Sequence, residues 1–285
     1  MRSGFLTIIG PANAGKSTLL NKLLKTNLNI VSSKPQTTRN NIAGILTDHK
    51  RGIQLVITDT PGILKKNVSI LDARLQDSIV KAVEDADIIL FLIPVKDTVS
   101  NYLEFFEKLK GKKVIICFNK IDLGKPSFSE AEKKLEFPMI EISALKELNI
   151  DSLFKIIDPL ITDEAQYYPD DVISDRTERF FVKEYIREGI LENLKEEIPH
   201  QIFVDIDTME EQAEIWRIEG TIYTERENHK KIIIGSAGSM IKKIGTEARK
   251  KSEELLSKKV FLKLEVKVKE NWRNDPIFLK KLEYY

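Results

Sequence analysis

Gly10-Pro-Ala-Asn-Ala-Gly15-Lys16-Ser17 decides the fold of the first half of this chain. It fits the phosphate-loop pattern, in which glycines let the backbone wrap phosphate groups and successive N–H groups favour their negative charge. An apolar run at residues 5–9 precedes it as a buried strand, and residues 17–24 follow with helical spacing. The pattern predicts a nucleoside triphosphate site at the end of a strand. The alternative is an ordinary glycine turn between strand and helix.

A second motif, Asp59-Thr60-Pro61-Gly62, follows the apolar run at residues 54–57. Lys16 is expected to reach the β- and γ-phosphates, and the Ser17 hydroxyl to hold Mg²⁺. The Asp59 carboxylate would support the ion through a water, because magnesium loses its hydration shell reluctantly. Gly62 can offer its N–H to a γ-phosphate and move once that phosphate leaves. Taken alone, this tetrapeptide is an ordinary turn.

The third motif, Asn119-Lys120-Ile121-Asp122, predicts the identity of the base. The Asp122 carboxylate can accept hydrogen bonds from the N1–H and 2-amino groups of guanine, whereas adenine has an acceptor at N1 and no 2-amino group. A hydrogen bond to a charged group contributes about 1.5–3 kcal/mol, and an unpaired buried partner costs a similar amount. Asn119 and Lys120 would brace the base and the phosphate loop. The motifs therefore predict guanine over adenine.

A fourth motif, Ser143-Ala144-Leu145, would place a backbone N–H near the guanine 6-oxo group, so GTP and GDP are the expected ligands. This motif is weak alone and gains meaning from its place in the series. The candidate nucleotide-binding residues are Asn13, Ala14, Gly15, Lys16, Ser17, Thr18, Asp59, Gly62, Asn119, Lys120, Asp122, Ser143, Ala144 and Leu145.

Length and charge predict two domains with different partners. A chain of 285 residues fits two domains at about 100–200 residues each. The net charge of +1 is unevenly distributed along the chain, because residues 230–285 carry fifteen Lys and Arg against seven Asp and Glu. That surplus predicts a polyanionic partner for the C-terminal part, with a solvated basic face as the alternative.

Other classes of protein are disfavoured by composition. No apolar run approaches the ~20 residues of a membrane helix, and the N-terminus enters a strand without a signal peptide. The lone Cys117 lies in an apolar run and is expected to be a buried hydrophobe, which fits a reducing cytoplasm. The three histidines lack metal-ligand spacing, so no metal beyond magnesium is predicted.

The first half is predicted to be a doubly wound α/β sheet with its ligand loops at the strand ends. Strands alternating with helical segments are expected at residues 5–9, 42–46, 54–57, 88–94, 113–118 and 139–142. A helix at 150–161 closes this domain. Domain bounds are predicted at 1–163 for the nucleotide domain, 164–179 for a linker and 180–285 for the second domain.

The second half is predicted to have the order α-β-β-α-α-β around a Gly235-Ser-Ala-Gly238 loop. Helices are expected at 177–196 and 239–256, and strands at 201–207, 213–224 and 260–269, with the apolar segment 232–234 directly before the loop, which is expected to join two helical segments. This order is that of a KH module of the second type, whose G-x-x-G loop clamps about four nucleotides of single-stranded RNA. The aromatics of the first helix fit a core better than a base-stacking surface. The RNA-binding candidates are Lys230, Lys231, Gly235, Ser236, Ala237, Gly238, Lys242 and Lys243, with Arg249 and Lys250 as further phosphate contacts.

With both halves considered, the chain resembles the Era family of bacterial GTPases over essentially its whole length. The likeness rests on the four motifs and on further stretches. These are Pro35-Gln-Thr-Thr-Arg39 in the first switch, Tyr167-Tyr-Pro169, Glu197-Ile-Pro199, Ile233-Ile-Gly235, Gly245-Thr-Glu-Ala-Arg249, Val266-Lys-Val268 and Trp272-Arg273. The implied fold is a doubly wound P-loop GTPase domain followed by an α+β type II KH domain.

The resemblance implies a GTPase that binds 16S ribosomal RNA near its 3′ end and acts in assembly of the small ribosomal subunit. It also implies a cytoplasmic protein, peripheral at the inner membrane in part, and we expect a monomer. Two departures from the family are the uncharged loop residues Ser236 and Ala237, where a basic residue is usual, and the ending Leu282-Glu-Tyr-Tyr285. The first departure predicts that RNA binding depends on the flanking lysines.

Lys16, Thr38 and Gly62 are the expected catalytic residues. Thr38 is preferred from the family pattern as the switch ligand of Mg²⁺, with Thr37 as the alternative. Ile63 follows Gly62, where Ras-like proteins have the glutamine that orients the attacking water, so slow intrinsic hydrolysis is expected. Asn13 stands where related GTPases use an asparagine to help bind K⁺, although it could equally satisfy its own loop.

Triphosphate is expected to order the switches and so control the RNA affinity of the KH domain. Two alternatives from other classes stay open. The chain could be an RNA-binding scaffold whose nucleotide never turns over, or a signalling GTPase whose basic face meets anionic lipid. The alternating strands and the G-x-x-G loop favour RNA over lipid, because a lipid-surface helix would show a stronger apolar face.

Overall fold

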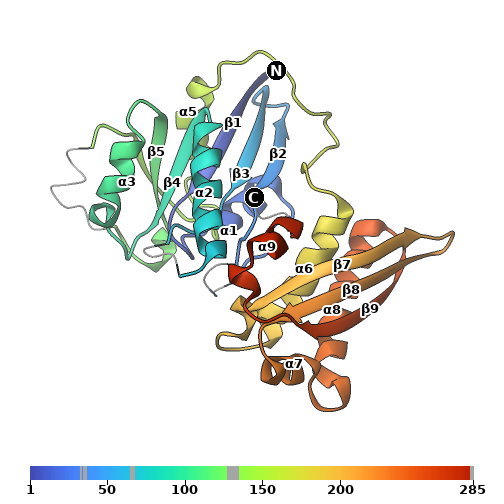
Figure 1. The fold of residues 1–285 in the computed structure, drawn as a ribbon. Helices are drawn as coiled ribbons and strands as arrows, with labels where there is room; N and C mark the ends of the chain where they lie inside the picture. Colours follow the sequence, from blue (N-terminus) through green and yellow to red (C-terminus); the bar gives the residue numbers. More distant parts are fainter. Residues whose placement is uncertain (33, 35–36, 65–67, 127–134, 283–285) are drawn as a thin grey trace. The chain divides into compact units, whose positions relative to one another are not determined.

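The computed structural model describes residues 1–32, 34, 37–64, 68–126 and 135–282. The chain forms two compact units, one of Met1–Asn67 and Asp72–Asp175 and one of Val68–Leu71 and Arg176–Tyr285. Figure 1 shows both, coloured along the sequence. The predicted functional bounds at 163 and 180 stay a prediction.

The first unit is built on a six-stranded sheet in the order β2-β3-β1-β4-β5-β6. Its strands are β1 (Arg2–Ile9), β2 (Ile42–Asp48), β3 (Ile53–Asp59), β4 (Ile88–Pro94), β5 (Lys113–Asn119) and β6 (Met139–Ile142). All neighbours are parallel except β2, which pairs with β3 antiparallel at the edge. Continuous apolar runs such as Ile88–Ile93 suit strands covered on both faces. The doubly wound fold is confirmed.

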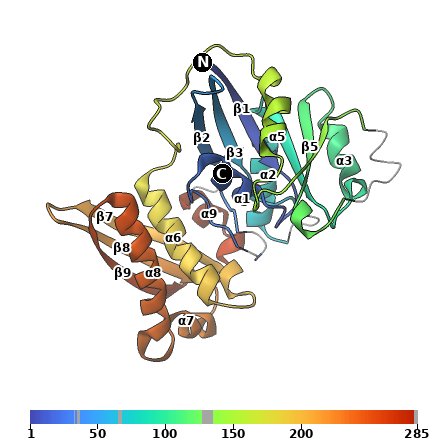
Figure 2. The same cartoon turned by 180° about the vertical axis from the view of Figure 1, so that it is seen from behind.

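Helices cover both faces of this sheet (Figures 1 and 2). They are α1 (Lys16–Leu24), α2 (Ile70–Glu84), α3 (Leu103–Lys108) and α5 (Ile150–Ile157), with 3₁₀ turns η1 (Val99–Tyr102), η2 (Ile121–Leu123) and η3 (Asp158–Leu160). On one face, Ile79 of α2 and Phe106 of α3 pack with Phe91 in a buried cluster. The helix predicted at 150–161 ends instead at Ile157, and Pro159 lies in the 3₁₀ turn that follows.

Strand register brings the four motifs to one edge of the sheet. Ile8 of β1 lies beside Asp59 of β3, and Asn119 of β5 lies beside Ile142 of β6. The phosphate loop follows β1, and Ser143 follows β6. Because parallel strands end at the same edge, the loops that carry the motifs converge there.

Part of the predicted linker is held against the first unit. Gln54 of β3 is fully buried; its Nε2 donates to the carbonyl of Tyr168 (2.8 Å), and its Oε1 accepts from the N–H groups of Tyr167 (2.9 Å) and Tyr168 (3.0 Å). The N–H of Ile45 in β2 donates to the carbonyl of Ile173 (3.0 Å). Residues 167–173 are thus tied to the β2–β3 edge.

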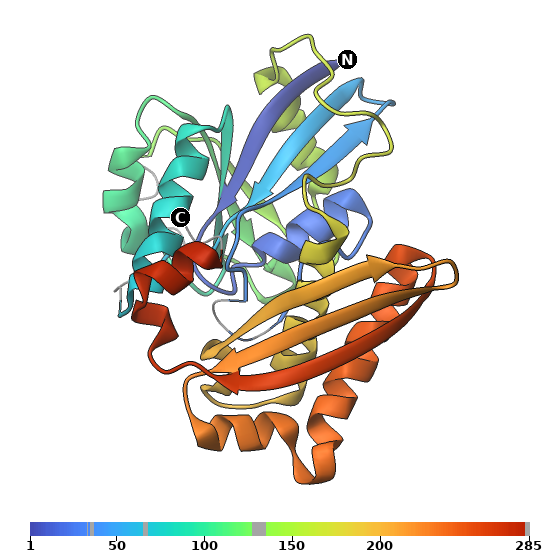
Figure 3. The same ribbon diagram turned by 45° about the vertical axis from the view of Figure 1, so that its right-hand side comes forward.

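The second unit has a three-stranded sheet, β7-β8-β9, in which β7 and β8 are antiparallel and β8 and β9 parallel. The longer helices of this unit pack on one face of it (Figure 3). The elements are α6 (Glu178–Asn193), β7 (Ile202–Glu211), β8 (Ile215–Thr224), α7 (Glu227–Ile234), α8 (Ser239–Leu256), β9 (Lys259–Val268) and α9 (Pro276–Lys281), with short turns η4 (Ile198–His200), η5 (Ser236–Gly238) and η6 (Trp272–Asn274). The predicted α-β-β-α-α-β order is confirmed.

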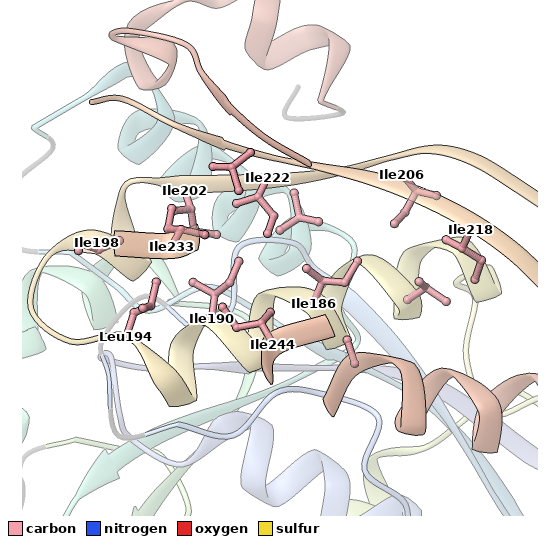
Figure 4. Packing of buried hydrophobic residues seen from close by; sticks show 14 of the residues in the cluster. Ile186, Ile190, Leu194, Ile198, Ile202, Ile206, Ile218, Ile222, Ile233 and Ile244 are labelled. Carbon is pink, nitrogen blue, oxygen red and sulfur yellow. The ribbon is translucent and has the colours of Figure 1, made fainter. Parts of the chain in front are cut away.

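Isoleucines dominate the core of this unit (Figure 4). Ile186 and Ile190 of α6 pack with Ile244 of α8 against the inward side chains of the sheet, and Tyr185 packs against the same cluster. The apolar segment 232–234 ends helix α7, which is the helical segment expected before the loop. Ile233 is fully buried while Ile232 is 47% exposed, as expected for one face of a helix.

A C-terminal segment follows β9 that the sequence patterns did not predict. Trp272 is fully buried, and its Nε1 donates to the carbonyl of Gln201 (3.1 Å). Arg273 forms a bidentate ion pair with Glu225, from Nε to Oε1 (3.2 Å) and from Nη2 to Oε2 (2.8 Å). Asp275 caps α9 by accepting from two N–H groups, with Pro276 at the first helical position.

Candidate functional site

The four motifs line one cavity of about 430 Å³ in the first unit. This volume lies within the ~300–1,000 Å³ range of small-molecule sites. The lining residues are Ala12, Asn13, Gly15, Lys16, Ser17, Thr18, Ile30, Val31, Ser32, Thr37, Thr38, Gly62, Asn119, Lys120, Asp122, Leu123, Ala144 and Leu145.

Three predicted site residues do not line this cavity. Ala14, Asp59 and Ser143 are fully buried behind it. Ile30, Val31 and Ser32 line the cavity although the sequence analysis did not name them. The sequence could have indicated these residues only by their position a few residues before Thr37 and Thr38.

Lys16 begins α1 and is 6% exposed. Its Nζ donates to the carbonyls of Gly10 (3.1 Å) and Pro11 (3.0 Å), which folds the ammonium back over its own loop. Burial lowers the pKa of Lys16 to about 8, with the nearby Asp59 charge acting in the opposite direction. Gly15 has φ 96°, and a Cβ there would run into the Asn119 carboxamide. A phosphate would give the buried ammonium the negative partner that it needs.

Hydroxyl and carboxylate oxygens gather beside Lys16. Ser17 Oγ donates to Asp59 Oδ2 (2.6 Å) and lies 3.0 Å from Thr38 Oγ1. Burial raises the pKa of Asp59, opposed by Lys16 and by hydrogen bonds from Ser17, Asn29 and Thr38. Asp59 Oδ1 is buried with no hydrogen-bond partner among the described residues. An all-oxygen set with an unsatisfied carboxylate oxygen fits Mg²⁺.

Thr38 rather than Thr37 approaches these oxygens, since the Thr37 hydroxyl donates to the carbonyl of Lys34 (2.7 Å). Pro35 and Gln36 of the first-switch stretch lie outside the described residues. Across the parts of the chain that the structure describes, no cluster of three or more His, Cys, Asp or Glu offers a separate metal site.

Gly62 is pressed against the phosphate loop. A Cβ at Gly62 would lie 2.8 Å from the backbone of Ala12, so only glycine fits without a shift. The N–H of Ile63 donates to the carbonyl of Gly10 (3.1 Å), while its side chain packs on the cluster around Phe91 and does not line the cavity.

Asn119 clamps two of the motif loops together. Its Nδ2 donates to the carbonyl of Ala14 (2.8 Å), and its Oδ1 accepts from the N–H of Ala144 (2.9 Å). Lys120, with φ 71°, donates from Nζ to the carbonyl of Asn13 (2.6 Å). These contacts tie the loop after β5 to the phosphate loop and to Ala144, while the contact of Asn119 and Lys120 with a base stays a prediction.

Ser143 holds the carboxylate expected to read the base. Its Oγ donates to Asp122 Oδ1 (2.5 Å) and accepts from the N–H of Lys146 (3.1 Å). The N–H of Ser143 pairs with the carbonyl of Leu148 (3.2 Å). The N–H of Ala144 already donates to Asn119 Oδ1. Leu145 is therefore the residue of this motif whose N–H we expect to donate to a base.

In the second unit, the Gly235–Gly238 loop turns sharply into α8. A Cβ at Gly235 (φ 75°) would lie 2.7 Å from Met240 Cβ, and Gly238 (φ 76°) faces open space. Ala237 adopts the left-handed region, with φ 49°. The backbone therefore opens outward at the start of an 18-residue helix, a geometry that suits a phosphate.

Lysines around this loop differ from those along the sheet. Lys258, Lys263 and Lys267 each form an ion pair with a glutamate, at 2.5, 3.2 and 3.3 Å. No ion pair within the described ranges involves the four predicted loop lysines, which are Lys230, Lys231, Lys242 and Lys243. Positive charge is thus left uncompensated where the sequence predicted RNA contacts.

Among the described helices, none has the length and apolar character needed to cross a membrane.

Family models match both halves of the chain. One described as "50S ribosome-binding GTPase" matches residues 5–120, and one described as "KH domain" matches residues 197–273. GTPase Era of Clostridium botulinum (strain Hall) is 45% identical over 294 residues, covering 99% of this chain and 98% of that protein. GTPase Era of Clostridium acetobutylicum is 42% identical over 298 residues, with the same shares covered.

Solved structures agree over the full length. The crystal structure of Era in complex with MgGDPNP and nucleotides 1506-1542 of 16S ribosomal RNA has a TM-score of 0.92 at 33% identity, covering 100% of this chain and 99% of that one. A variant of Aquifex aeolicus Era bound to GDP·AlF4⁻ has a TM-score of 0.92 at 34% identity, with the same coverage. This likeness runs through both halves, and the chain belongs to the Era family of GTPases.

Proposed function

We propose that this protein binds and hydrolyses GTP with Mg²⁺ in its first unit and binds 16S ribosomal RNA near the 3′ end through its KH unit, as a nucleotide-switched assembly factor of the small ribosomal subunit. One observation carries the nucleotide assignment. The cavity places the Asp122 carboxylate at one part of its wall and the Lys16–Ser17–Thr38 group at another, in front of the buried Asp59. A purine edge and its phosphates need these two kinds of group.

Each residue has a distinct role in the proposed reaction. Lys16 and the loop N–H groups bind the phosphates, and the Gly62 N–H contacts the terminal one. Ser17 and Thr38 would ligate Mg²⁺, which neutralises charge on the phosphates when bound, and Asp59 would accept from a metal-bound water. Ile63 packs away from the cavity and cannot hydrogen-bond a water, which supports slow hydrolysis that depends on another group to position the nucleophile.

A phosphate-release assay tests this assignment directly. We expect release from GTP, little from ATP, and none when Mg²⁺ is chelated. Absence of release from GTP under single-turnover conditions would favour the alternative of an RNA-binding scaffold with a structural nucleotide. Equal release from ATP would remove the role given to Asp122.

The RNA assignment is supported by the uncompensated lysines around the G-x-x-G loop and by the RNA bound to the Era structure matched above. The family description names the 50S subunit, whereas that structure holds 16S RNA. We follow the structure, because it covers the whole chain and the family model covers only residues 5–120.

Binding of an RNA oligonucleotide with the sequence of the 16S 3′ end tests this part. Lys242→Ala with Lys243→Ala should weaken binding and lower the salt dependence by about two phosphate contacts. Lys263→Ala with Lys267→Ala, which removes lysines already paired with glutamates, is the matched control. If anionic vesicles compete with the RNA on equal terms, the lipid-directed alternative gains support.

Potassium is a further proposal for the phosphate loop. Asn13 lines the cavity with φ 60°, and its carbonyl accepts from Lys120 Nζ. A carboxamide at this place can add an oxygen to a K⁺ site beside the phosphates. Hydrolysis faster in K⁺ than in Na⁺, with the difference lost in Asn13→Ala, is the expected result.

We also propose a monomer in the cytoplasm that can associate peripherally with the inner membrane, and functional bounds at 1–163 and 180–285. The family resemblance is the support for these statements. Light scattering and flotation with vesicles of inner-membrane composition would test the first two.

A further inference from the structure

A residue outside every motif reaches the proposed magnesium site. Asn29 is 6% exposed, and its Nδ2 donates to Asp59 Oδ2 (2.7 Å). The same oxygen accepts from Ser17 Oγ (2.6 Å). Asp59 Oδ1 remains buried with no partner among the described residues. Thr38 Oγ1 lies 3.5 Å from Asp59 Oδ2 as well. The donors thus gather on one oxygen of the carboxylate and leave the other oxygen available to accept.

The backbone of Asn29 is fixed to α1 by two further bonds. Its N–H donates to Asn21 Oδ1 (2.8 Å), and its carbonyl accepts from Asn21 Nδ2 (2.8 Å). Asn21 is 7% exposed and lies on the helix that begins with the phosphate-loop Lys16. The flanking Leu28 and Ile30 are buried as well. Asn29 therefore links three segments that carry site residues, namely α1, the start of the first switch and the end of β3.

We infer that Asn29 is a positioning residue for magnesium. Its carboxamide orients Asp59 so that Oδ1 can accept a hydrogen bond from a water on the ion held by Ser17 and Thr38. Asn29 Oδ1 is a second buried acceptor without a partner among the described residues. This inference rests on the proposed function. Mutation of residues that hydrogen-bond to metal ligands typically lowers metal affinity by roughly 10–100-fold.

Asn29→Leu isolates the bond in question. Leucine has nearly the same size and shape as asparagine, and it keeps the backbone N–H and carbonyl that bind Asn21. It removes only the donor to Asp59 and the acceptor on the same carboxamide. Asn27→Leu is the matched control, because Asn27 is exposed and two residues away in the same segment.

The experiment measures release of a fluorescent GDP analogue from the full chain across Mg²⁺ concentrations, from chelator to millimolar. For Asn29→Leu we expect the Mg²⁺ midpoint to rise about tenfold, with release rates equal to wild type in chelator and at saturating Mg²⁺. Asn27→Leu should keep the wild-type midpoint. A merely structural role for Asn29 would instead speed release by one factor at every concentration.

An unchanged midpoint, or acceleration that persists in chelator, would overturn the inference. If Asn29→Leu does not fold, Asn29→Ser serves in its place, since a serine hydroxyl is too short to reach Asp59 and the same shift is expected. Wild-type protein that releases no phosphate from GTP in Mg²⁺ would defeat the proposed function itself, so the two failures are distinguishable.

Discussion

At the scale of single residues, we expect base specificity to depend on the Ser143 hydroxyl, which donates to the Asp122 carboxylate. Ser143→Ala would remove the 2.5 Å bond that fixes Asp122. Because a hydrogen bond to a charged group contributes about 1.5–3 kcal/mol, we expect GDP affinity to fall roughly 10–100-fold. Calorimetry measures this, with the exposed Ser152→Ala on α5 as control. GDP affinity equal to wild type would show that Asp122 needs no such support.

Ile63 follows Gly62, but its side chain is partly buried and packs against the hydrophobic cluster that contains Phe91. Ile63→Ala should therefore leave the single-turnover rate of GTP hydrolysis within about twofold of wild type. It should lower stability, because truncating a buried isoleucine costs about 2–5 kcal/mol and this one is only partly buried. Rapid-quench hydrolysis and urea unfolding measure the two effects. A large loss of rate in the folded variant would assign Ile63 a part in the chemistry.

Lys16 gives a pH dependence to the nucleotide-free protein. Its pKa is about 8 in the folded chain, below the usual 10.5. Between these values the unfolded state binds more protons, so the Lys16 contribution to the free energy of unfolding rises with pH. Burial raises the pKa of Cys117 and Tyr102, which act in the opposite direction. The quantity to measure is therefore the difference in unfolding free energy between wild type and Lys16→Met, from pH 7 to 10. A flat difference would contradict the lowered pKa.

The motif residues could be assigned from sequence because each motif joins a fixed spacing to a specific chemical need. Lys16, Ser17 and Asp122 line or support the cavity as expected. Asn29 could not be found this way, because its contact with Asp59 spans thirty residues and follows no pattern. The sequence did not distinguish the hydroxyl of Ser143 as the partner of Asp122 either.

At the scale of elements, the β2–β3 edge holds the segment that leads to the KH unit. Gln54→Leu would leave the N–H groups of Tyr167 and Tyr168 without their acceptor. Each such hydrogen bond contributes about 0.5–1.5 kcal/mol, so we expect local release of residues 164–175 and faster proteolysis there. Limited proteolysis with mass spectrometry reads this out. Cleavage at the wild-type rate in Gln54→Leu would show that the segment is held by other contacts.

Element boundaries followed local signals where those signals were strong. The helix predicted at 239–256 matches α8, because glycine precedes it and apolar residues recur with helical spacing along it. The run Ile232–Ile234 is β-branched, a composition that favours strands, yet it ends helix α7, where Ile233 packs in the core. Helix α9 is six residues long, too short for a periodic pattern, and its cap at Asp275 was the only sign.

At the scale of the whole molecule, nucleotide and RNA should be linked. We expect RNA affinity to differ at least fivefold between the GDP form and a form with non-hydrolysable GTP, a coupling of about 1 kcal/mol. The RNA must then change GTP-analogue affinity by the same factor, since binding linkage is reciprocal. Fluorescence titrations in both orders measure it. Equal RNA affinity in the two forms would separate the two activities.

The sequence by itself determined the two-part architecture, the four nucleotide motifs and the G-x-x-G loop, because these depend on local spacing and on the chemistry of a few residue types. Only the tertiary structure decided that β2 runs antiparallel at the sheet edge and that Gln54 holds residues 167 and 168. It also decided that Asn29 supports Asp59. These are buried polar contacts between distant segments, and their partners are set by how the strands and loops pack together.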